Sequence, residues 1–429
     1  MTKIIKRIAF ISYHSSPLAT LGGKDAGGMN VFVREAAREF AQRGVQVDVF
    51  TRSTSPTLQR IDTRIHPDVR VIHVPAGPEG PVPKNDFIKY VPEFTDWICQ
   101  FSRTSYSTHH LSMLSQDHGY DLIHAHYWLS GLVAEHLKPC WGVPFVQTFH
   151  TLAELKNQIA ERDQDRESEE RLLNECHICD VANRITAATE VEWNQLVHMY
   201  GAGSSRIRIV PPGVDLSRFR PIDQTYAKQI IDAPQDHRLI MFAGRVEPLK
   251  GIDTLFRAIA IMRDRGAECA LCGLSVVIIG GDSSQIGLQT NAEMARLHKL
   301  RSELHLDDVI TFLGAQDQDT LPNYLAAADC VVMPSHYESF GMVALEAMAC
   351  GTPVIASDVG GLSKLVRHEE TGYLVPPRDP VTLANAIEHL LADDAFRRRM
   401  GHRAACYAED YSWSNIVDRL EAVYTEILI

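Results

Sequence analysis

Two glutamates with a specific spacing, Glu338 and Glu346, have seven residues between them in the stretch MPSHYESFGMVALEAMACGTPVIASDVGG. The apolar run that ends at Pro334 predicts a strand, and the pattern after it predicts a helix that begins near Phe340. Glu338 would lie in the connecting loop, and Glu346 about two turns later on the helix. Parallel sheets bind ligands at the carboxyl ends of their strands. A carboxylate placed there can accept two hydrogen bonds from a vicinal diol such as a ribose.

Backbone amides at the start of this predicted helix add a site for an anion. Free N–H groups at a helix N-terminus attract negative charge. They belong here to Ser339, Phe340, Gly341 and Met342. With the two glutamates they indicate a nucleotide that carries a phosphate and sugar hydroxyls. The alternative is an ordinary strand–loop–helix with solvated glutamates, which the spacing alone would favour.

Two cations, Arg245 and Lys250, follow another predicted strand in the segment GRVEPLKG. Arginine offers a bidentate fork and lysine a point charge, and both suit a diphosphate. A departing nucleoside diphosphate needs such charges when the bond to it breaks. For this pair taken alone, a solvated loop is the better interpretation.

The alternation of strands and helices predicts the elements that position these residues. Two doubly wound, Rossmann-like α/β domains are expected, at 1–210 and 211–411, and a last helix at 412–429. The boundary falls in PPGVDLSRFRP, whose prolines and glycine suit a linker. The predicted strands are 7–13, 45–51, 70–74, 120–125, 143–149, 183–188, 206–210, 238–243, 274–280, 309–313, 329–333 and 353–357. The predicted helices before the last one are 29–43, 86–116, 165–181, 252–265, 287–305, 319–327 and 341–350.

Length and composition narrow the class of protein. The chain has 429 residues, which suggests two or three domains, and its net charge of −12 argues against a nucleic-acid partner. No apolar run is long enough to span a bilayer. The basic start with its short apolar run fits a first strand better than a signal peptide. We expect a cytoplasmic protein without membrane contact, as a monomer or a homodimer.

A glycine-rich loop runs from His14 to Gly28, between a predicted strand and a predicted helix. This arrangement is typical of phosphate binding. The loop lacks the GxGxxG pattern of dinucleotide-binding proteins and the Gly-Lys-Ser/Thr of a P-loop. A dinucleotide oxidoreductase and a P-loop nucleotidase are therefore disfavoured, although a simple turn would explain the loop equally well.

Metal binding is not expected from the candidate ligand pairs. His124 and His126 alternate on one strand but lack an evident third ligand, so a loop that shapes a cleft is the better interpretation. The remaining pairs fall in helical patterns, before an apolar strand or in polar stretches that we interpret as solvated faces. They are Cys176/Cys179, Cys269/Cys272, Asp163/Asp165 and Asp317/Asp319.

The glutamate segment and the Arg245/Lys250 segment together resemble the retaining glycosyltransferases of family four, which have the GT-B fold. The resemblance implies two Rossmann-like domains that face a central cleft, with the last helix crossing back to the first domain. It also implies a UDP-sugar as the donor substrate, no cofactor and no required metal. The leaving diphosphate itself would deprotonate the acceptor hydroxyl.

The same resemblance assigns roles to residues of the donor site. Arg245 and Lys250 would stabilise the leaving diphosphate, Glu338 would bind the hydroxyls of the transferred sugar, and Glu346 the ribose. His150 would contact the donor sugar near its oxocarbenium-like centre. The catalytic residues would be Glu338, His150, Arg245 and Lys250. The other donor-binding residues would be Gly28, Ser339, Phe340, Gly341, Met342 and Val343.

Three further stretches, GGMNVFVREAAREFAQRGVQVDVFTR, HAHYWLSG and HTLAELKN, resemble D-inositol-3-phosphate glycosyltransferases, and bacterial sucrose-phosphate synthases share much of this pattern. The resemblance implies transfer of GlcNAc or glucose to a phosphorylated polyol or sugar. The alternatives are sucrose-phosphate synthesis from UDP-glucose and fructose 6-phosphate, and a non-catalytic nucleotide-sugar-binding protein. The implied acceptor-binding residues are Asn30, Lys84, Tyr127, Thr151 and Arg171.

Overall fold

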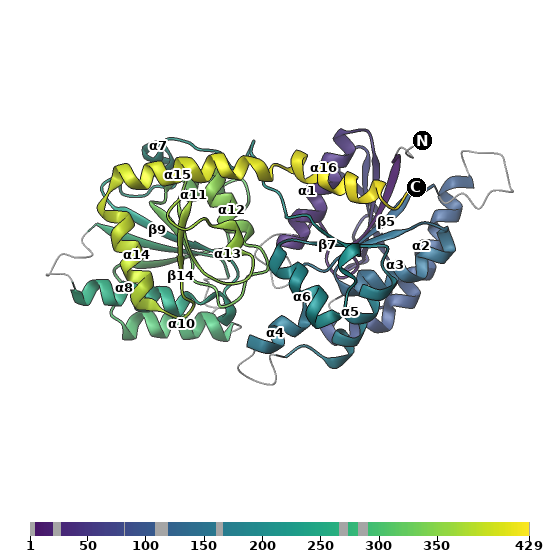
Figure 1. The fold of residues 1–429 in the computed structure, drawn as a ribbon, viewed down its shortest axis with the longest axis horizontal. Coiled ribbons are helices and arrows are strands. Elements are labelled where there is room, and N and C mark those ends of the chain that lie inside the picture. The colour runs from purple at the N-terminus through teal and green to yellow at the C-terminus, as the bar shows by residue number, and fades with distance from the viewer. Residues whose placement is uncertain are drawn as a thin grey trace. The chain divides into compact units, whose positions relative to one another are not determined.

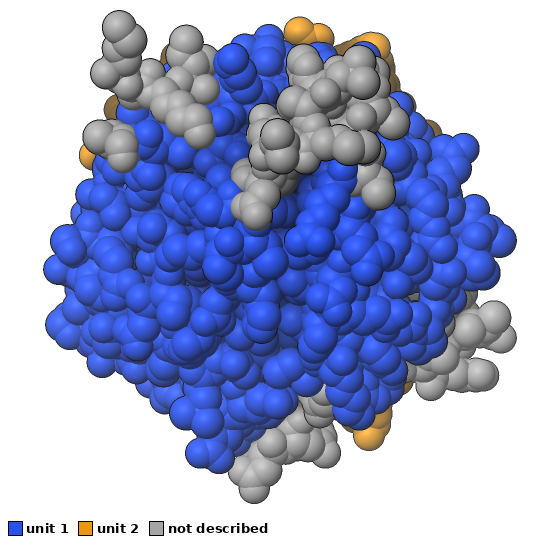
Figure 2. Space-filling model, turned by 90° about the vertical axis from the view of Figure 1, so that its right-hand side faces the viewer, with its two compact units in different colours: residues 1–19, 25–211, 413–429 blue, residues 20–24, 212–412 orange. Residues whose placement is uncertain are grey.

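The computed structural model of the protein describes residues 5–19, 27–80, 82–107, 119–159, 166–265, 273–281 and 291–428. They form two compact units, drawn as a ribbon in Figure 1 and as a surface in Figure 2. Unit 1 holds the described residues of 1–19, 25–211 and 413–429, and unit 2 those of 212–412. The last segment of the chain therefore belongs to the first unit, and in Figure 2 the blue segments of unit 1 form one continuous body.

Unit 1 is built on an eight-stranded sheet in the order β3-β4-β2-β1-β5-β6-β7-β8. Its strands are β1 (Arg7–Ile11), β2 (Gln46–Arg52), β3 (Ile61–His66), β4 (Val69–Val74), β5 (Leu122–His126), β6 (Phe145–Thr148), β7 (Arg184–Ala187) and β8 (Ile207–Ile209). All neighbouring strands are parallel except β3 and β4. The sheet of unit 1 is therefore parallel except at this edge. Only two residues separate β3 from β4, and so short a connection can join only antiparallel strands.

Helices cover both faces of this sheet (Figure 1). They are α1 (Gly28–Gln42), α2 (Val91–Ser107), α3 (Trp128–Trp141), α4 (Ala153–Ile159), α5 (Glu169–Val181), α6 (Glu190–Tyr200) and α16 (Trp413–Thr425), with short 3-10 turns at Lys84–Tyr90 and Ser204–Arg206. Successive residues of β1 point to opposite faces. Ala9 and Ile11 pack in a buried cluster with Phe94 of α2, whereas the Phe10 ring meets the Phe40 ring of α1 edge-on.

Unit 2 contains a six-stranded parallel sheet in the order β11-β10-β9-β12-β13-β14. Its strands are β9 (Arg238–Ala243), β10 (Leu274–Ile279), β11 (Ile310–Gly314), β12 (Cys330–Met333), β13 (Val354–Ser357) and β14 (Gly372–Val375). Its helices are α7 (Gln224–Ile230), α8 (Ile252–Arg265), α10 (Ala292–Glu303), α11 (Leu321–Ala327), α12 (Met342–Ala349), α13 (Leu362–Leu365), α14 (Pro380–Ala392) and α15 (Asp394–Ala408), with 3-10 turns at Pro248–Lys250 and Glu409–Tyr411. Both units are Rossmann-like, as the α/β prediction stated.

Each sheet has one place where the strand order reverses. In unit 1 the chain builds outward from β1 to one side and returns to β5 on the other side. In unit 2 the same reversal lies between β9 and β12. Loops that follow two such strands leave in opposite directions and open a crevice at the carboxyl ends of the strands. These two reversal points are therefore where the candidate site residues should gather.

Helix α16 is held on unit 1 by polar and aromatic contacts. The Arg43 guanidinium, at the end of α1, donates hydrogen bonds to Asp418, Glu421 and the carbonyl oxygen of Ser414. Further along the helix, the Tyr424 ring is fully buried and stacks on Phe40 at a centroid distance of 5.5 Å. Helix α16 thus completes the layer that α1 begins.

The predicted helix over 86–116 differs in its first part. Residues Lys84–Tyr90 form a 3-10 turn, and α2 begins only at Val91. The part beyond Ser107 lies outside the described residues. Across the described part of the chain, none of the helices combines the length and the hydropathy needed to cross a membrane.

Candidate active site

Lys250 and Glu338 meet at the reversal point of unit 2. Lys250 ends the turn that follows β9, and Glu338 lies in the loop that follows β12. The Lys250 Nζ donates a hydrogen bond of 2.5 Å to Glu338 Oε2, and both side chains are mostly buried. A cation and a carboxylate that face one another in a crevice can bind a ligand with both negative charge and hydroxyl groups.

Backbone contacts hold these two loops together. The N–H of His336 donates to the carbonyl oxygen of Leu249 at 2.8 Å. Gly251 has a φ of +61°, and a Cβ atom at this position would lie only 2.1 Å from the carbonyl oxygen of Pro334. On the other side, the N–H of Gly361 donates to the carbonyl oxygen of Glu338 at 3.0 Å. The loop that carries Glu338 is therefore fixed from two directions.

Arg245 lies further out than Lys250. Its side chain is 44% exposed and donates a hydrogen bond of 2.7 Å to Glu247, two residues along the same loop. The Arg245 fork is thus held by a neighbour on the surface, and the Lys250 ammonium is held by Glu338. The structure places both predicted cations after β9 but gives them different partners.

Helix α12 starts later than predicted. Its first residue is Met342, and Gly341 is the N-cap with a φ of +104°. Ser339 and Phe340 are therefore loop residues. The N-cap position has a positive φ, a conformation that glycine adopts readily, so the helix begins only after Gly341. The N-cap glycine offers no side-chain cap, so among the described residues no capping side chain occupies the amides of the first turn, such as those of Met342 and Val343.

Glu346 lies on α12 and is only 6% exposed. It lies on the helix, as predicted, one turn past the first residue Met342. A buried carboxylate is costly unless it has polar partners, so this side chain is not the solvated glutamate of the alternative interpretation.

Three histidines gather at the carboxyl ends of β5 and β6 in unit 1. His126 Nδ1 lies 3.1 Å from His150 Nε2, and the rings of His124 and His126 are 4.2 Å apart. The two ring nitrogens of His124 lie 2.6 Å from the hydroxyl of Tyr424 and 2.7 Å from that of Thr148. His150, the predicted sugar-binding residue, is thus the last member of a polar cluster that runs from Tyr424 of α16 through His124 and His126.

Burial keeps these histidines neutral. It lowers the pKa of His124, helped by the neighbouring His150, to about 3, and it lowers the pKa of His150 to about 3. The pKa of His126 falls well below its usual value for the same reason, with added repulsion from the other two rings. At neutral pH each ring therefore carries one proton, which it can donate, and one lone pair, which can accept.

Two residues at these strand ends have strained backbones. Tyr127, directly after β5, has a φ of +76°, and His150, two residues after β6, has a φ of +62°. Bulky residues rarely adopt positive φ, and such strain collects at functional sites. The amide of Tyr127 donates to the carbonyl oxygen of Thr148, which joins the two strand ends.

The predicted acceptor residues Tyr127, Thr151 and Arg171 form one cluster in unit 1. The Arg171 guanidinium lies over the Tyr127 ring, 4.9 Å from its centroid. Its Nη2 donates to the carbonyl oxygen and the hydroxyl of Thr151 at 2.9 and 3.2 Å. Arg171 is 1% exposed although it lies on a charge-rich helix, so its side chain does not belong to a solvated face.

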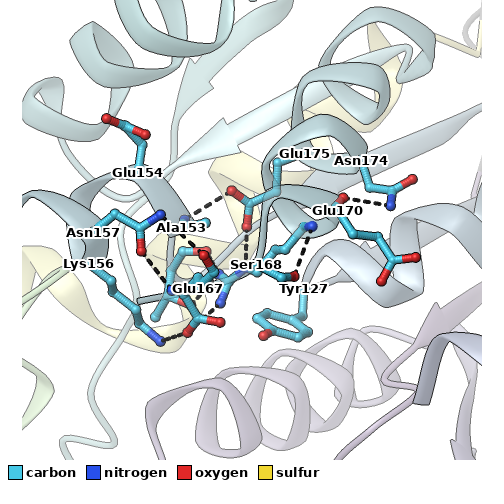
Figure 3. Close-up of polar contacts among 12 residues, drawn as sticks. Tyr127, Ala153, Glu154, Lys156, Asn157, Glu167, Ser168, Glu170, Asn174 and Glu175 are labelled. Atoms are coloured by element: carbon cyan, nitrogen blue, oxygen red, sulfur yellow. Dashed lines mark hydrogen bonds and ion pairs between the residues drawn. The ribbon is translucent and has the colours of Figure 1, made fainter. Parts of the chain in front are cut away.

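Arg171 and its partners involve three charged residues that the sequence did not single out, Lys156, Glu167 and Glu175, which Figure 3 labels. Glu175 accepts a hydrogen bond of 2.7 Å from Arg171 Nε, and Glu167 lies 2.9 Å from Arg171 Nη1. Lys156 donates to the same Glu167 oxygen at 3.0 Å. The only sequence signal for this cluster is the i, i+4 spacing of Glu167, Arg171 and Glu175, which is also typical of exposed helix pairs.

The other predicted residues of unit 1 have different positions. Asn30 is buried, and its amide accepts from the Gly27 N–H and donates to Ser15 and Ser16, so it ties the loop after β1 to α1. Gly28 is the first residue of α1. Lys84 begins a 3-10 turn, and its side chain lies outside the described part of the structure.

The remaining pairs that we considered as metal ligands lie in ordinary structural positions or outside the described residues. The Asp317 carboxylate accepts from the amides of Asp319 and Thr320, which shapes the turn before α11. Cys176 and Cys179 are free thiols on α5. Asp163/Asp165 and Cys269/Cys272 lie outside the described residues. Within the described residues, His, Cys, Asp and Glu form no group of three or more that suits a metal ion.

Two family models match the chain, one in each half. The family model for Glycosyltransferase Family 4 matches residues 26–218, and that for Glycosyl transferases group 1 matches residues 223–406. A D-inositol 3-phosphate glycosyltransferase from Saccharomonospora viridis is 41% identical over 99% of this chain and 94% of its own length.

Two solved structures extend the comparison. A sucrose-phosphate synthase from Thermosynechococcus elongatus is 34% identical, with a TM-score of 0.85 over 98% of both chains. The Anabaena protein HepE, in complex with UDP and glucose, shares the fold at 20% identity, with a TM-score of 0.73 over 97% of this chain and 98% of its own.

The two Rossmann-like units and the family matches define a glycosyltransferase of the GT-B fold. Within that class, the chain belongs to glycosyltransferase family 4, together with the D-inositol 3-phosphate glycosyltransferases that it resembles over its whole length.

Proposed function

We propose that the protein transfers a hexosyl group, GlcNAc or glucose, from a UDP-sugar to a phosphorylated polyol, with retention of the anomeric configuration. The observation that carries the proposal is the contact of 2.5 Å between Lys250 and Glu338 at the reversal point of unit 2. One of these residues suits the diphosphate of the donor, and the other suits the hydroxyls of its sugar.

The donor would engage the loops after β9 and β12. Arg245 and Lys250 neutralise the diphosphate, and the amides at the start of α12 bind an anion in the same way. Glu338 accepts hydrogen bonds from the sugar, and Glu346 from the ribose. We also propose that no metal is required, because two cations already serve the leaving group. Turnover that is unchanged by a chelator is the expected result.

The reaction would need no protein nucleophile. The bond between the anomeric carbon and the diphosphate oxygen breaks while the acceptor oxygen bonds to the same carbon from the same face. The acceptor proton passes to the departing diphosphate, which becomes the base. His150, with a pKa lowered to about 3, stays neutral and can hydrogen-bond the sugar without repelling the positive charge that develops on it.

A phosphorylated acceptor is supported by the cluster around Arg171. The Thr151 hydroxyl and the Tyr127 ring lie beside a buried guanidinium, and Lys84 is proposed as a second cation. The relatives at about 40% identity are named for D-inositol 3-phosphate. A second candidate is sucrose-phosphate synthesis from UDP-glucose and fructose 6-phosphate, which the solved synthase at 34% identity favours.

A turnover assay read by mass spectrometry tests the proposal. UDP-GlcNAc and UDP-glucose are each offered with D-inositol 3-phosphate, fructose 6-phosphate and the unphosphorylated forms of both. Transfer to the inositol phosphate alone is expected, and transfer to fructose 6-phosphate alone would establish the second candidate.

Two other outcomes contradict the proposal. Transfer only to unphosphorylated acceptors would overturn the acceptor class and leave the donor site intact. Tight UDP binding without transfer to any acceptor would indicate a non-catalytic nucleotide-sugar-binding protein. We propose a cytoplasmic location, where nucleotide sugars are available, and cell fractionation tests it.

A further inference from the structure

One carboxylate oxygen in unit 1 bridges two cations at the proposed acceptor site. Glu167 Oε1 lies 2.9 Å from Arg171 Nη1 and 3.0 Å from Lys156 Nζ. Figure 3 shows Lys156 and Glu167 pointing toward each other. An oxygen held between a guanidinium and an ammonium has the surroundings that a phosphate oxygen would have.

The contact between Glu167 and Arg171 is an incomplete hydrogen bond. Nη1 of Arg171 is buried, and it has no hydrogen-bond partner among the described residues, although Glu167 is within ion-pair distance. The charges therefore attract, while the N–H bonds of Nη1 point elsewhere. Since buried donors are rarely left unpaired, this donor is available to a better-placed acceptor oxygen.

The two carboxylates around Arg171 are not equivalent. Glu175 is fully buried, and it accepts hydrogen bonds from Arg171 Nε and from the Ala153 amide, so it is fixed. The Glu167 side chain is 13% exposed. Of the two, Glu167 is the one that can turn toward solvent.

The main chain of Glu167 is anchored independently of its carboxylate. Its N–H donates to the Asn157 side chain at 2.7 Å, and the Asn157 amide donates back to its carbonyl oxygen at 3.3 Å. The carboxylate can therefore leave Arg171 by a side-chain rotation, while the main chain of Glu167 stays hydrogen-bonded to Asn157 of α4.

Charge counting favours such a movement when a phosphate arrives. Among the printed contacts of the described residues, two cations, Lys156 and Arg171, face two carboxylates, Glu167 and Glu175, so these four charges cancel. A phosphate dianion that entered beside Glu167 would meet like charge at close range, which is costly. Once Glu167 has turned away, Lys156 and Arg171 outnumber the remaining carboxylate of these four groups, Glu175.

We propose that Glu167 is a placeholder for the acceptor phosphate and that Lys156 is a further phosphate-binding residue. In the free protein the Glu167 carboxylate neutralises Arg171 and Lys156, and the phosphate displaces it on binding. This inference rests on the proposed function, because it concerns the phosphate of the same acceptor. It also makes Glu167 a determinant of specificity, since a neutral acceptor has no charge with which to displace it.

The test compares Glu167→Gln with Glu170→Gln, an exposed control on the same stretch that removes the same charge. Isothermal titration with inorganic phosphate and the KM for the phosphorylated acceptor are measured for both. We expect the phosphate Kd and this KM to fall about tenfold for Glu167→Gln, because the competing charge is gone. The donor KM should not change.

Lys156→Met provides the opposite variant, with the exposed Lys89→Met as its control. We expect Lys156→Met to raise both the phosphate Kd and the acceptor KM about tenfold or more. A Lys156→Met protein that binds phosphate like its control would remove Lys156 from the proposal. Calorimetric melting of each variant establishes that it is folded.

The outcomes separate this inference from the proposed function. If Glu167→Gln binds phosphate no more tightly than Glu170→Gln, or more weakly, Glu167 orients Arg171 and the placeholder is overturned, whatever the acceptor. If Glu167→Gln binds phosphate more tightly but only unphosphorylated acceptors are glycosylated, the placeholder stands and the proposed acceptor is wrong.

Discussion

Nδ1 of His126 lies 3.1 Å from Nε2 of His150, and the two rings come from the ends of neighbouring strands. Both rings are neutral, so one nitrogen of the pair donates and the other accepts. The second nitrogen of His126, Nε2, is buried and has no hydrogen-bond partner among the described residues. A buried N–H without an acceptor is rarer than a bare lone pair, so His126 should carry its proton on Nδ1. His150 then carries its own on Nδ1.

This arrangement predicts the tautomer of His150, which long-range proton–nitrogen NMR correlation can read. We expect Nδ1 of His150 to be the protonated nitrogen, and we expect His126→Phe to give a mixture of tautomers. His402→Phe, at an exposed site, should leave the signals of His150 unchanged. A wild-type His150 protonated on Nε2 would reverse the hydrogen bond and contradict the prediction.

The buried histidines also predict how stability depends on pH. The folded pKa of His124 is lowered to about 3, while the unfolded chain protonates histidine near 6.5. Between these values the unfolded state binds the extra proton. The contribution is therefore fully present above about pH 6.5 and is lost as pH falls toward 3, by up to about 1.4 kcal/mol per pH unit. Urea unfolding at pH 7, 6 and 5 should show a shallower slope for His124→Gln, with His402→Gln unchanged.

The hydroxyl of Tyr424 predicts a link between α16 and the histidines. Tyr424→Phe leaves His124 Nδ1 without its partner in a buried position. We expect a loss of about 1–3 kcal/mol in the free energy of unfolding. Tyr226→Phe, on an exposed site of unit 2, should change it by less than about 0.5 kcal/mol. Equal effects of the two substitutions would show that the buried contact contributes nothing.

Alanine substitutions at Gly251 and Gly201 distinguish the effect of a steric collision from the effect of backbone strain. Their φ values are +61° and +68°, but a Cβ at Gly251 would collide with Pro334, whereas none of the described atoms lies within 4 Å of a Cβ at Gly201. Gly201→Ala should cost about 1 kcal/mol, from the backbone alone. Gly251→Ala should cost more and lower turnover at least about tenfold, because it pushes the loops of Lys250 and Glu338 apart. Melting temperature and kcat are the measurements.

We expect the Lys250→Met variant to be defective in the chemical step. The loss of a cation from the leaving group should lower kcat about 100- to 1,000-fold, while the acceptor KM stays near its original value. Lys299→Met, on an exposed face of α10, is the matched control and should keep full turnover. A Lys250→Met enzyme with normal kcat would remove Lys250 from catalysis.

The fold was largely predictable where burial is continuous. The predicted strand 238–243 and helix 252–265 coincide with β9 and α8, because an apolar run and a helical period are clear there. Strand β3 lies at the sheet edge and was not predicted, since its sequence IDTRIH is mostly polar and lacks a continuous apolar run. The start of α12 was placed too early, because the left-handed backbone of Gly341 is set by tertiary packing.

For the candidate site, the sequence predicted which residues take part better than it predicted the contacts between them. Spacing drew attention to Lys250 and Glu338, but the hydrogen bond between them joins residues 88 positions apart, and only the sheet order brings them together. Glu167 and Glu175 could not be recognised, because a run of charges on a helix is the pattern of a solvated face. Burial of Arg171 is decided by the packing of α5, which no local pattern encodes.

The return of α16 to unit 1 affects the order in which the chain can fold on the ribosome. Unit 2 is drawn from the continuous stretch 212–412, so its sheet can close as soon as that stretch has emerged. The sheet of unit 1 is translated first, yet Phe40 and His124 lack the Tyr424 ring until the final helix leaves the exit tunnel. The half of the protein that is made first is therefore the half that is finished last, and its uncovered aromatic face is the surface that a nascent-chain chaperone would meet.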